Sequence, residues 1–207
     1  MPRVLSTAVA IGCAALIGSH CGSRPQPQGL NLPPRRAELT LDDRAAWKAA
    51  LDWPADCEDA FQASRVSDDA GLVFHQLAAN ISLVEVLCAL GSYQPSSVFI
   101  MLDERAAPRA EALTFRAYRS EDGETVERFD TSELWGEPTV LSSQQELTML
   151  NLSRQIGDCG IWTRYSLRDG TPRVLDVRGQ LPCPSTPGRR AISESGGPPA
   201  EWKEIGQ

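Results

Sequence analysis

The sequence predicts a mainly β protein: a single antiparallel sheet or sandwich-like domain with a short N-terminal helical segment and two disulfides. Three observations support this fold class. From Gly71 onward, short apolar or alternating runs are separated by turn residues, which is typical of strands. Asp-Gly pairs at 122–123 and 169–170 stand between such runs, as in tight hairpins. Four cysteines fall between residues 57 and 183.

The size and charge of the chain exclude several classes of protein. A length of 207 residues suits one domain. Hydrophobic residues make up 42% and charged residues 23%, which argues against wholesale disorder and against a multispan membrane protein. Acidic residues outnumber basic ones by 27 to 20, so the formal net charge is −7. Because phosphate neutralisation needs a basic surface, we expect no nucleic-acid partner.

Residues 1–23 have the pattern of a secretory signal peptide. Arg3 precedes an apolar run from Val4 to Ile17, and small and polar residues follow. The run is shorter than the roughly 20 residues that a membrane-spanning helix needs. We therefore expect an exported protein.

Two cysteines in this segment raise the alternative of a lipoprotein signal, in which an apolar-small-small-Cys box receives the lipid. Ala10-Ile11-Gly12-Cys13 fits the box after a very short apolar stretch. Gly18-Ser19-His20-Cys21 has a better length but an unsuitable His before the Cys. Either Cys13 or Cys21 is thus a candidate for lipidation, and ordinary cleavage near residues 21–23 is the other reading. A lipid anchor would be the only contact with a membrane.

Proline-rich stretches set the expected domain boundaries. Residues 24–37 contain four prolines and no periodic apolar pattern, which predicts an extended linker or an untethered, disordered N-terminus. Pro184 begins a second irregular stretch, so residues 185–207 are predicted to be a flexible tail. The disulfide-braced domain is then 38–184.

The helical segment is predicted directly after the linker. Thr40 and Asp43 have the spacing of a capping box, which predicts a helix over 41–51. Trp53-Pro54 ends it, and a short second helix places Cys57 and Phe61 on one face. Acidic residues are dense here, which indicates a solvated helical face or, alternatively, an acidic docking surface or cation site.

The strands follow from Gly71 to residue 178. Leu83–Leu90 and Val98–Leu102 are the most apolar runs and should form the centre of the sheet. The expected strands are 72–78, 81–90, 97–102, 112–119, 124–130, 146–153, 160–167 and 172–178.

An even number of cysteines in an exported domain indicates two disulfides, with three possible connectivities. We favour Cys57–Cys88 and Cys159–Cys183, because each pair is near in sequence and the first ties the helical segment to a central strand. A free, buried Cys88 is the main alternative. Zinc sites use close CxxC-type pairs, which the chain lacks, so we expect no metal site.

These cysteines and their neighbours resemble an exported bacterial family known as domain of unknown function 1176. The resemblance covers about 53–183: Trp53-Pro54 with Cys57, the run from Leu83 to Gln94, Gly157-Asp158-Cys159-Gly160, and Cys183. Glu201–Ile205 is similar to a terminal Trp motif of the family. Gly-Asp-Cys-Gly is the most specific element. The resemblance implies a periplasmic or envelope location and no assigned activity.

Few residues suit catalysis. His75 is the only histidine after the signal segment, and alternation places it within a strand, as a hydrogen-bonded sheet residue. The chain lacks the Gly-x-Ser-x-Gly, phosphate-loop and His-Glu-x-x-His motifs. We therefore expect no catalytic residue and no cofactor. Carboxylate chemistry, which needs two nearby acids and no histidine, is the remaining enzymatic alternative.

Asp158 is the leading candidate for a ligand contact. Gly157 and Gly160 would let the backbone approach a ligand closely, and Cys159 would hold the turn rigidly. An aspartate before a disulfide also commonly accepts backbone N–H bonds, so a structural role is the competing interpretation.

Arg164 and Arg168 are the other candidate ligand-binding residues. Period two places them on one face of a hairpin, with Trp162 and Tyr165 on opposite faces. Such a surface could bind an anionic polymer or a protein, and solvated strand edges explain the arginines equally simply. The resulting prediction is an exported domain that binds an envelope protein or glycan without catalysis. The alternative is a carboxylate-dependent hydrolase of an envelope polymer.

Overall fold

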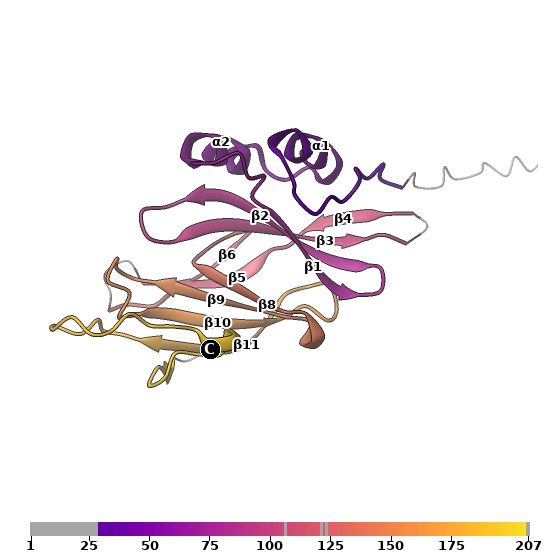
Figure 1. The fold of residues 1–207 in the computed structure, drawn as a ribbon. Helices are drawn as coiled ribbons and strands as arrows, with labels where there is room; N and C mark the ends of the chain where they lie inside the picture. Colours follow the sequence, from indigo (N-terminus) through magenta and orange to yellow (C-terminus); the bar gives the residue numbers. More distant parts are fainter. Residues whose placement is uncertain (1–28, 106, 121, 123, 206–207) are drawn as a thin grey trace, which may run out of the picture.

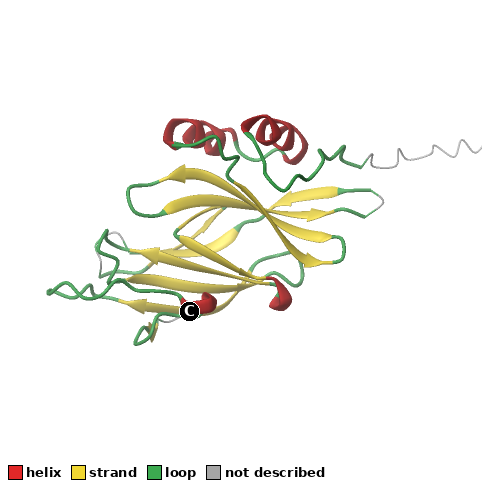
Figure 2. Cartoon of the chain, viewed as in Figure 1, coloured by secondary structure: helices red, strands yellow, loops and turns green. Residues whose placement is uncertain are grey.

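The computed structural model describes residues 29–105, 107–120, 122 and 124–205. The predicted signal peptide, with Cys13 and Cys21, lies outside these residues. Helices α1 (Leu41–Leu51) and α2 (Ala55–Ser64) cover one face of a sheet, and a second sheet lies beneath it (Figures 1 and 2). The strands pair antiparallel, so the predicted mainly β fold with a short helical segment is confirmed.

The strands form two large sheets and one hairpin. The upper sheet has the order β1-β2-β3-β4, with β7 also paired to β3; the lower sheet has the order β12-β11-β10-β9-β8; and β5 pairs with β6. Leu83–Leu90 and Val98–Leu102 belong to β2 and β3, the expected centre. The strand bounds are β1 Leu72–Ala78, β2 Ile81–Leu90, β3 Pro95–Asp103, β4 Arg109–Ala112, β5 Phe115–Arg119, β6 Glu127–Thr131, β7 Glu133–Trp135, β8 Glu137–Leu141, β9 Glu146–Leu152, β10 Gly160–Ser166, β11 Arg173–Gln180 and β12 Lys203–Glu204.

Some predicted strands have different bounds. The expected strand 112–119 begins at Phe115, as β5, because Ala112 still pairs with the upper sheet as the last residue of β4, a strand that was not expected. Strands β7 and β8 were not expected. They are three and five residues long and flank Gly136, whose φ is +132°, so neither shows a long alternating pattern.

Helix α1 begins with the predicted capping box. The Thr40 hydroxyl accepts a hydrogen bond from the Asp43 N–H, and the Asp43 carboxylate accepts one from the Thr40 N–H at 2.9 Å. The helix ends at Asp52, which adopts a left-handed conformation with φ 53°. The box satisfies N–H groups that have no partner within the helix, and it fixes where α1 starts.

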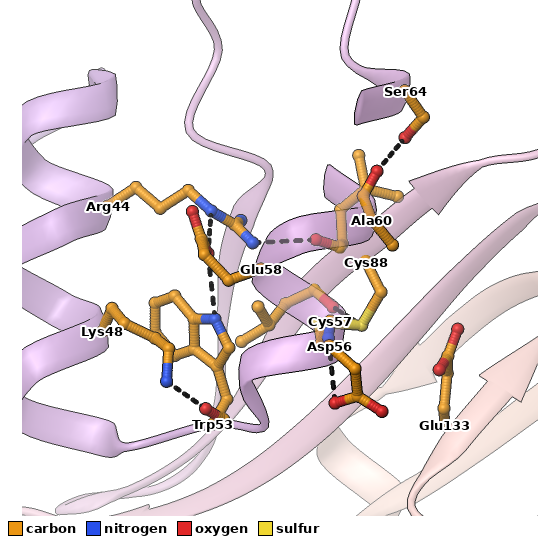
Figure 3. The surroundings of a disulfide bond; sticks show 12 residues. Arg44, Lys48, Trp53, Asp56, Cys57, Glu58, Ala60, Ser64, Cys88 and Glu133 are labelled. Carbon is orange, nitrogen blue, oxygen red and sulfur yellow. Dashed lines mark hydrogen bonds and ion pairs between the residues drawn. A yellow bond between two sulfur atoms is a disulfide. The ribbon is translucent and has the colours of Figure 1, made fainter. Parts of the chain in front are cut away.

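Arg44 connects both helices to the upper sheet (Figure 3). Its side chain is 1% exposed, and its Nε donates to Glu58 Oε2 at 2.8 Å. Its remaining nitrogens donate to the carbonyl oxygens of Ala70 and Leu87. The guanidinium lies 3.6 Å from the centre of the Phe61 ring, a cation–π contact. One buried cation thus fixes α1, α2 and β2 relative to one another.

The first disulfide lies in the core between the helices and the upper sheet. Cys57 on α2 bonds to Cys88 on β2, and the second disulfide joins Cys159 to Cys183, so the favoured pairing is confirmed. Cys88 shares its face of the sheet with Val84 and Val86, whereas Leu83 points to the opposite side. This alternation gives each face of β2 its own core.

A second core fills the space between the two sheets. Phe115 makes edge contacts with Phe99 of the upper layer and Tyr165 of the lower layer, with ring centres 5.7 and 5.1 Å apart. The β5–β6 hairpin therefore stands between the sheets and contributes to both layers. The other buried members of this core include Leu77, Leu83, Leu113, Leu134, Leu147, Met149 and Leu167.

The described part of the predicted linker lies on the domain rather than extending from it. The Leu30 N–H donates to the Pro108 carbonyl, and Leu32 packs against the helical core. Arg35 donates to Glu104 at 2.6 Å and stacks over the Phe74 ring. Apolar side chains between the prolines pack against the domain. The high proline content had predicted an extended linker without such contacts.

The prediction of a flexible tail after residue 184 is wrong for residues 185–205. Strand β12 pairs with β11, and Trp202, which is 8% exposed, packs against Leu150, Leu152 and Trp162 on the outer face of the lower sheet. A short 3-10 helix at Glu194–Gly196 contacts β8 and β9 nearby. Because this segment is irregular and rich in proline and glycine, its sequence did not indicate that it covers one face of the lower sheet.

The two disulfides should contribute unequally to stability. Their chain separations of 31 and 24 residues predict loop-entropy contributions of about 3–4 kcal/mol each, which differ by only a few tenths. Cys57 and Cys88 are both buried in the helix–sheet core, whereas Cys183 is partly exposed. We expect replacement of Cys57 and Cys88 by Ala to lower the urea midpoint more than replacement of Cys159 and Cys183. Equal midpoints would contradict this.

Candidate functional site

Asp158, the leading candidate from the sequence, is buried and fully engaged. Its carboxylate accepts two hydrogen bonds from Arg154, both at 2.7 Å, and one from the Gly188 N–H at 2.6 Å. Its side chain is 1% exposed. The Arg154 hydrogen bonds are the main cause that lowers the pKa of Asp158 to about 2. The carboxylate therefore holds the chain after Cys183 against the β9–β10 loop, which is the structural role weighed above.

Arg164 and Arg168 do not join Asp158 in one site. Asp158 precedes β10 and Arg168 follows it, so the strand separates them by roughly 20 Å. Arg164 Nη1 lies 3.8 Å from Glu146 Oε2, and Arg168 Nε donates to the Gln144 carbonyl. These arginines have partners within the lower sheet and its connections.

The aromatic residues expected beside these arginines are buried. Trp162 and Tyr165 do face opposite sides of β10, as alternation predicts, but each is only 1% exposed. Trp162 is covered by Trp202, and the Tyr165 hydroxyl donates to the Arg116 carbonyl. Burial raises the pKa of Tyr165. Neither ring is available to a polymer on the surface.

The structure instead places a pocket of about 460 Å³ at one end of the layers. This end pocket lies where the β2–β3 turn, β7, the end of β9 and the β5–β6 hairpin meet. The β2–β3 turn and the end of β9 lie at the left side of Figure 1. Its volume falls in the range of about 300–1,000 Å³ that small-molecule sites occupy. The lining residues are Tyr93, Gln94, Ala117, Tyr118, Arg119, Ser120, Phe129, Thr131, Glu133, Leu134, Trp135, Met149, Asn151, Leu152, Ser153, Thr163 and Tyr165.

Two aromatic residues at the rim of the end pocket are exposed to solvent, and the strand register places the Trp135 side chain on the helix-facing side of β7. Trp135 is 47% exposed and Tyr93 is 37% exposed. The Trp135 ring lies beside Gly91, where an added Cβ would be 3.1 Å from the ring and 2.5 Å from the Gln94 carbonyl oxygen. Gly91 thus allows the β2–β3 turn to approach Trp135 closely.

Backbone contacts orient the two amide side chains of the pocket. Gln94 Oε1 accepts a hydrogen bond from the Leu152 N–H, and Asn151 Nδ2 donates to the Trp135 carbonyl, both at 2.9 Å. The Gln94 NH₂ and the Asn151 Oδ1 have no partner among the described residues. The Ser153 Oγ is buried and also lacks a partner there. The pocket therefore offers both donors and acceptors.

The pocket carries little unpaired charge. Arg119 forms an ion pair with Glu127 at 2.9 Å and stacks over the Phe129 ring. Glu133 is the single carboxylate among the lining residues, and its side chain lies on the helix-facing side of β7, toward Cys57 (Figure 3). The site is thus an aromatic and hydroxyl- or amide-lined pocket rather than a charged one.

A second cavity of about 730 Å³ lies between the C-terminal segment and the lower sheet. Asp158, Arg190 and Trp202 line it. Asp158 and Trp202 have the structural contacts described above, and Arg190 pairs with Glu137 at 2.5 Å. This cavity therefore follows from the way the segment covers the sheet.

Sequence reasoning missed the residues that define the end pocket. Tyr93 and Gln94 entered the sequence analysis only as the end of the run from Leu83 to Gln94, and Trp135 and Asn151 belong to strands that meet only after folding. An exposed aromatic residue beside a strand-ending glycine, as in Trp135-Gly136, was the available signal. His75 has the expected sheet position, with its Nε2 3.0 Å from Glu85 Oε2.

No helix in the described part of the chain is long and apolar enough to cross a membrane. Within the same residues, no group of three or more His, Cys, Asp and Glu side chains is placed to hold a metal ion.

The Asp158 contacts predict an acid-sensitive loss of stability. A carboxyl whose pKa falls from 3.8 to about 2 on folding stabilises the fold above pH about 4, and this contribution is lost as pH drops toward 2. Urea midpoints should therefore be lower for Asp158→Asn than for the wild type at pH 7, and the difference should shrink between pH 4 and 2. Asp52→Asn, on a 99% exposed side chain, is the control. A difference that does not change with pH would contradict this assignment.

Comparisons of the chain with family models, with curated proteins and with solved structures find no match. The resemblance to the exported bacterial family, and the location that it implies, stay predictions.

Proposed function

We propose that the chain is an exported bacterial envelope domain that binds a protein or glycan partner through the end pocket and has no catalytic role. The observation that carries this proposal is the pocket itself: a cavity of about 460 Å³ with the exposed Tyr93 at its rim and with unpartnered polar groups. Sites with this composition are typical of ligand recognition. The two disulfides are consistent with an extracellular or periplasmic protein.

The lining of the pocket favours binding over hydrolysis. Carboxylate-dependent hydrolysis uses two acids that flank the bond to be broken. Glu133 is the one carboxylate that lines the end pocket, and Asp158 is held in an ion pair elsewhere. The hydrolase alternative therefore has no paired acids at this site.

The position of the pocket suits a domain that is attached through its N-terminal side. Gly29 and Leu30 lie against Pro108, beside the β3–β4 connection. The pocket lies at the β2–β3 turn, at the other end of β3 (Figure 1). Nine residues of strand separate the two ends by roughly 26 Å. The described chain therefore enters the domain at the end of β3 opposite the pocket.

Export predicts processing of the N-terminus. The mature protein in envelope fractions should begin beyond residue 12, as measured by intact mass. If Cys13 or Cys21 carries a lipid, its replacement by Ala should move the protein out of the membrane fraction. Detection of the unprocessed chain alone would contradict export with cleavage, and an unchanged distribution of both Ala variants would contradict lipidation.

Binding through the end pocket predicts position-dependent capture of a partner. A photo-crosslinking residue at Tyr93, in the pocket, should capture an envelope component in cells. The same residue at Arg105, near the opposite end of β3 and 69% exposed, is the matched control. Capture at position 93 that is lost with Gln94→Glu, which keeps the acceptor for the Leu152 N–H and removes the donor, would support the proposal. Equal capture at both positions, or none at position 93, would overturn it.

A further inference from the structure

We infer that the edge of β1 is a second interaction surface, at which two copies of the chain pair antiparallel and join their upper sheets into one. This inference is independent of the end pocket, because none of the residues that line the pocket belongs to β1. It starts from the sheet order. Strand β1 ends the upper sheet and, among the described residues, pairs on one side only, with β2. Leu77 and Ala78 border a small cavity with Gln145, so η1 (Ser142–Gln144) approaches β1 at that end.

The register of β1 shows which of its backbone groups point away from β2. The Leu87 N–H donates to the Gly71 carbonyl, so the ladder bonds of β1 recur at every second residue, at Val73 and His75. The alternate residues carry the N–H and C=O groups that point to the open side: Leu72, Phe74 and Gln76. These groups have no partner among the described residues. The open side of β1 therefore matches the backbone of another extended strand.

The other strands that end the two large sheets have features that discourage pairing, and β1 lacks them. Natural proteins protect exposed sheet edges with short strands, prolines and charged side chains. Strands β4, β7 and β12 have four, three and two residues, and β8 contains Pro138. Strand β1 has seven residues and contains no Pro, Asp, Glu, Lys or Arg. This difference favours β1 as the edge that takes a partner.

A second copy fits this edge because β1 is complementary to itself. An antiparallel pair centred on Phe74 places Leu72 opposite Gln76 of the second copy, so every outward N–H meets an outward C=O. On the other face, the exposed Val73 lies opposite His75 of the second copy. The chain carries a formal net charge of −7, and at this uncharged strand two copies meet without bringing like charges together.

The edge is held in place within one copy. The Phe74 ring packs against Trp47 of α1, with ring centres 4.7 Å apart, and Arg35 stacks over the same ring. On the opposite face, His75 Nε2 lies 3.0 Å from Glu85 Oε2. A strand that is already ordered loses little conformational freedom when it pairs.

The first test measures the mass of the purified exported chain by sedimentation, over concentrations of about 1 to 200 µM. The wild type should form a dimer with a Kd below about 100 µM. Val73→Lys places a charge on the edge and should raise this Kd by about tenfold or more, with an unchanged urea midpoint at low protein concentration. Val66→Lys, on a residue that is 86% exposed and outside the strands, is the matched control and should dimerise like the wild type.

A disulfide tests the register of the pair. Two differently tagged copies, one with Val73→Cys and the other with His75→Cys, should form a mixed disulfide. The reason is that opposite residues at a non-hydrogen-bonded position have Cα atoms about 4.5 Å apart, within reach of a disulfide. Peptide mapping should locate the bond between positions 73 and 75. Val66→Cys with His75→Cys is the control pair and should not crosslink.

The outcomes separate this inference from the proposed function. A chain that stays monomeric overturns the inference, whether the edge is open or covered by a strand of another protein. A dimer that Val73→Lys leaves unchanged, or a mixed disulfide that forms equally in the control pair, also overturns it, because the contact between copies then lies elsewhere. Failure of partner capture at position 93 overturns the proposed function alone, since the end pocket and β1 share no residue.

Discussion

The arrangement of the helices on the upper sheet depends on the buried guanidinium of Arg44. A buried charge is costly unless it is paired and hydrogen-bonded, and each of the three nitrogens of Arg44 donates to a partner, on α2, on the loop before β1 and on β2. Apolar packing of Trp47 and Trp53 then fills the space that this geometry defines. The cation gives the helical layer its position, and the disulfide beside it limits how far that layer can separate from the sheet.

Local features were predictable because their causes are local. The capping box at Thr40 needs only residues three positions apart, and the β10–β11 hairpin needs only alternation around Asp169-Gly170. The disulfide pairing was also accessible, since each bridge joins nearby segments. The core strands β2 and β3 were found because strands buried on both faces are apolar along their whole length.

Features that depend on distant segments were not predictable from the pattern. Trp202 looked like part of an irregular tail because its contacts, Leu150 and Trp162, come from strands far away in the chain. Asp158 was identified as interesting for its neighbours in sequence, but its role depends on Arg154 and on Gly188, thirty residues away. The end pocket lies between elements from three different sheets. In the sequence, the polar residues of the pocket look like any others. Only the fold shows which of their polar groups have no hydrogen-bond partner among the described residues.

The C-terminal segment that covers the lower sheet has a consequence for the order of folding. For a chain that crosses a membrane N-terminus first, the helices and the upper sheet are delivered before β9, β10 and β11. The apolar patch formed by Leu150, Leu152 and Trp162 then stays open to solvent until residues 185–205 have followed. During that interval such an exposed apolar patch would be open to contact with a chaperone or with a second nascent chain. Docking of Trp202 would cover the patch. Such contacts would therefore end only after the C-terminal segment had crossed the membrane.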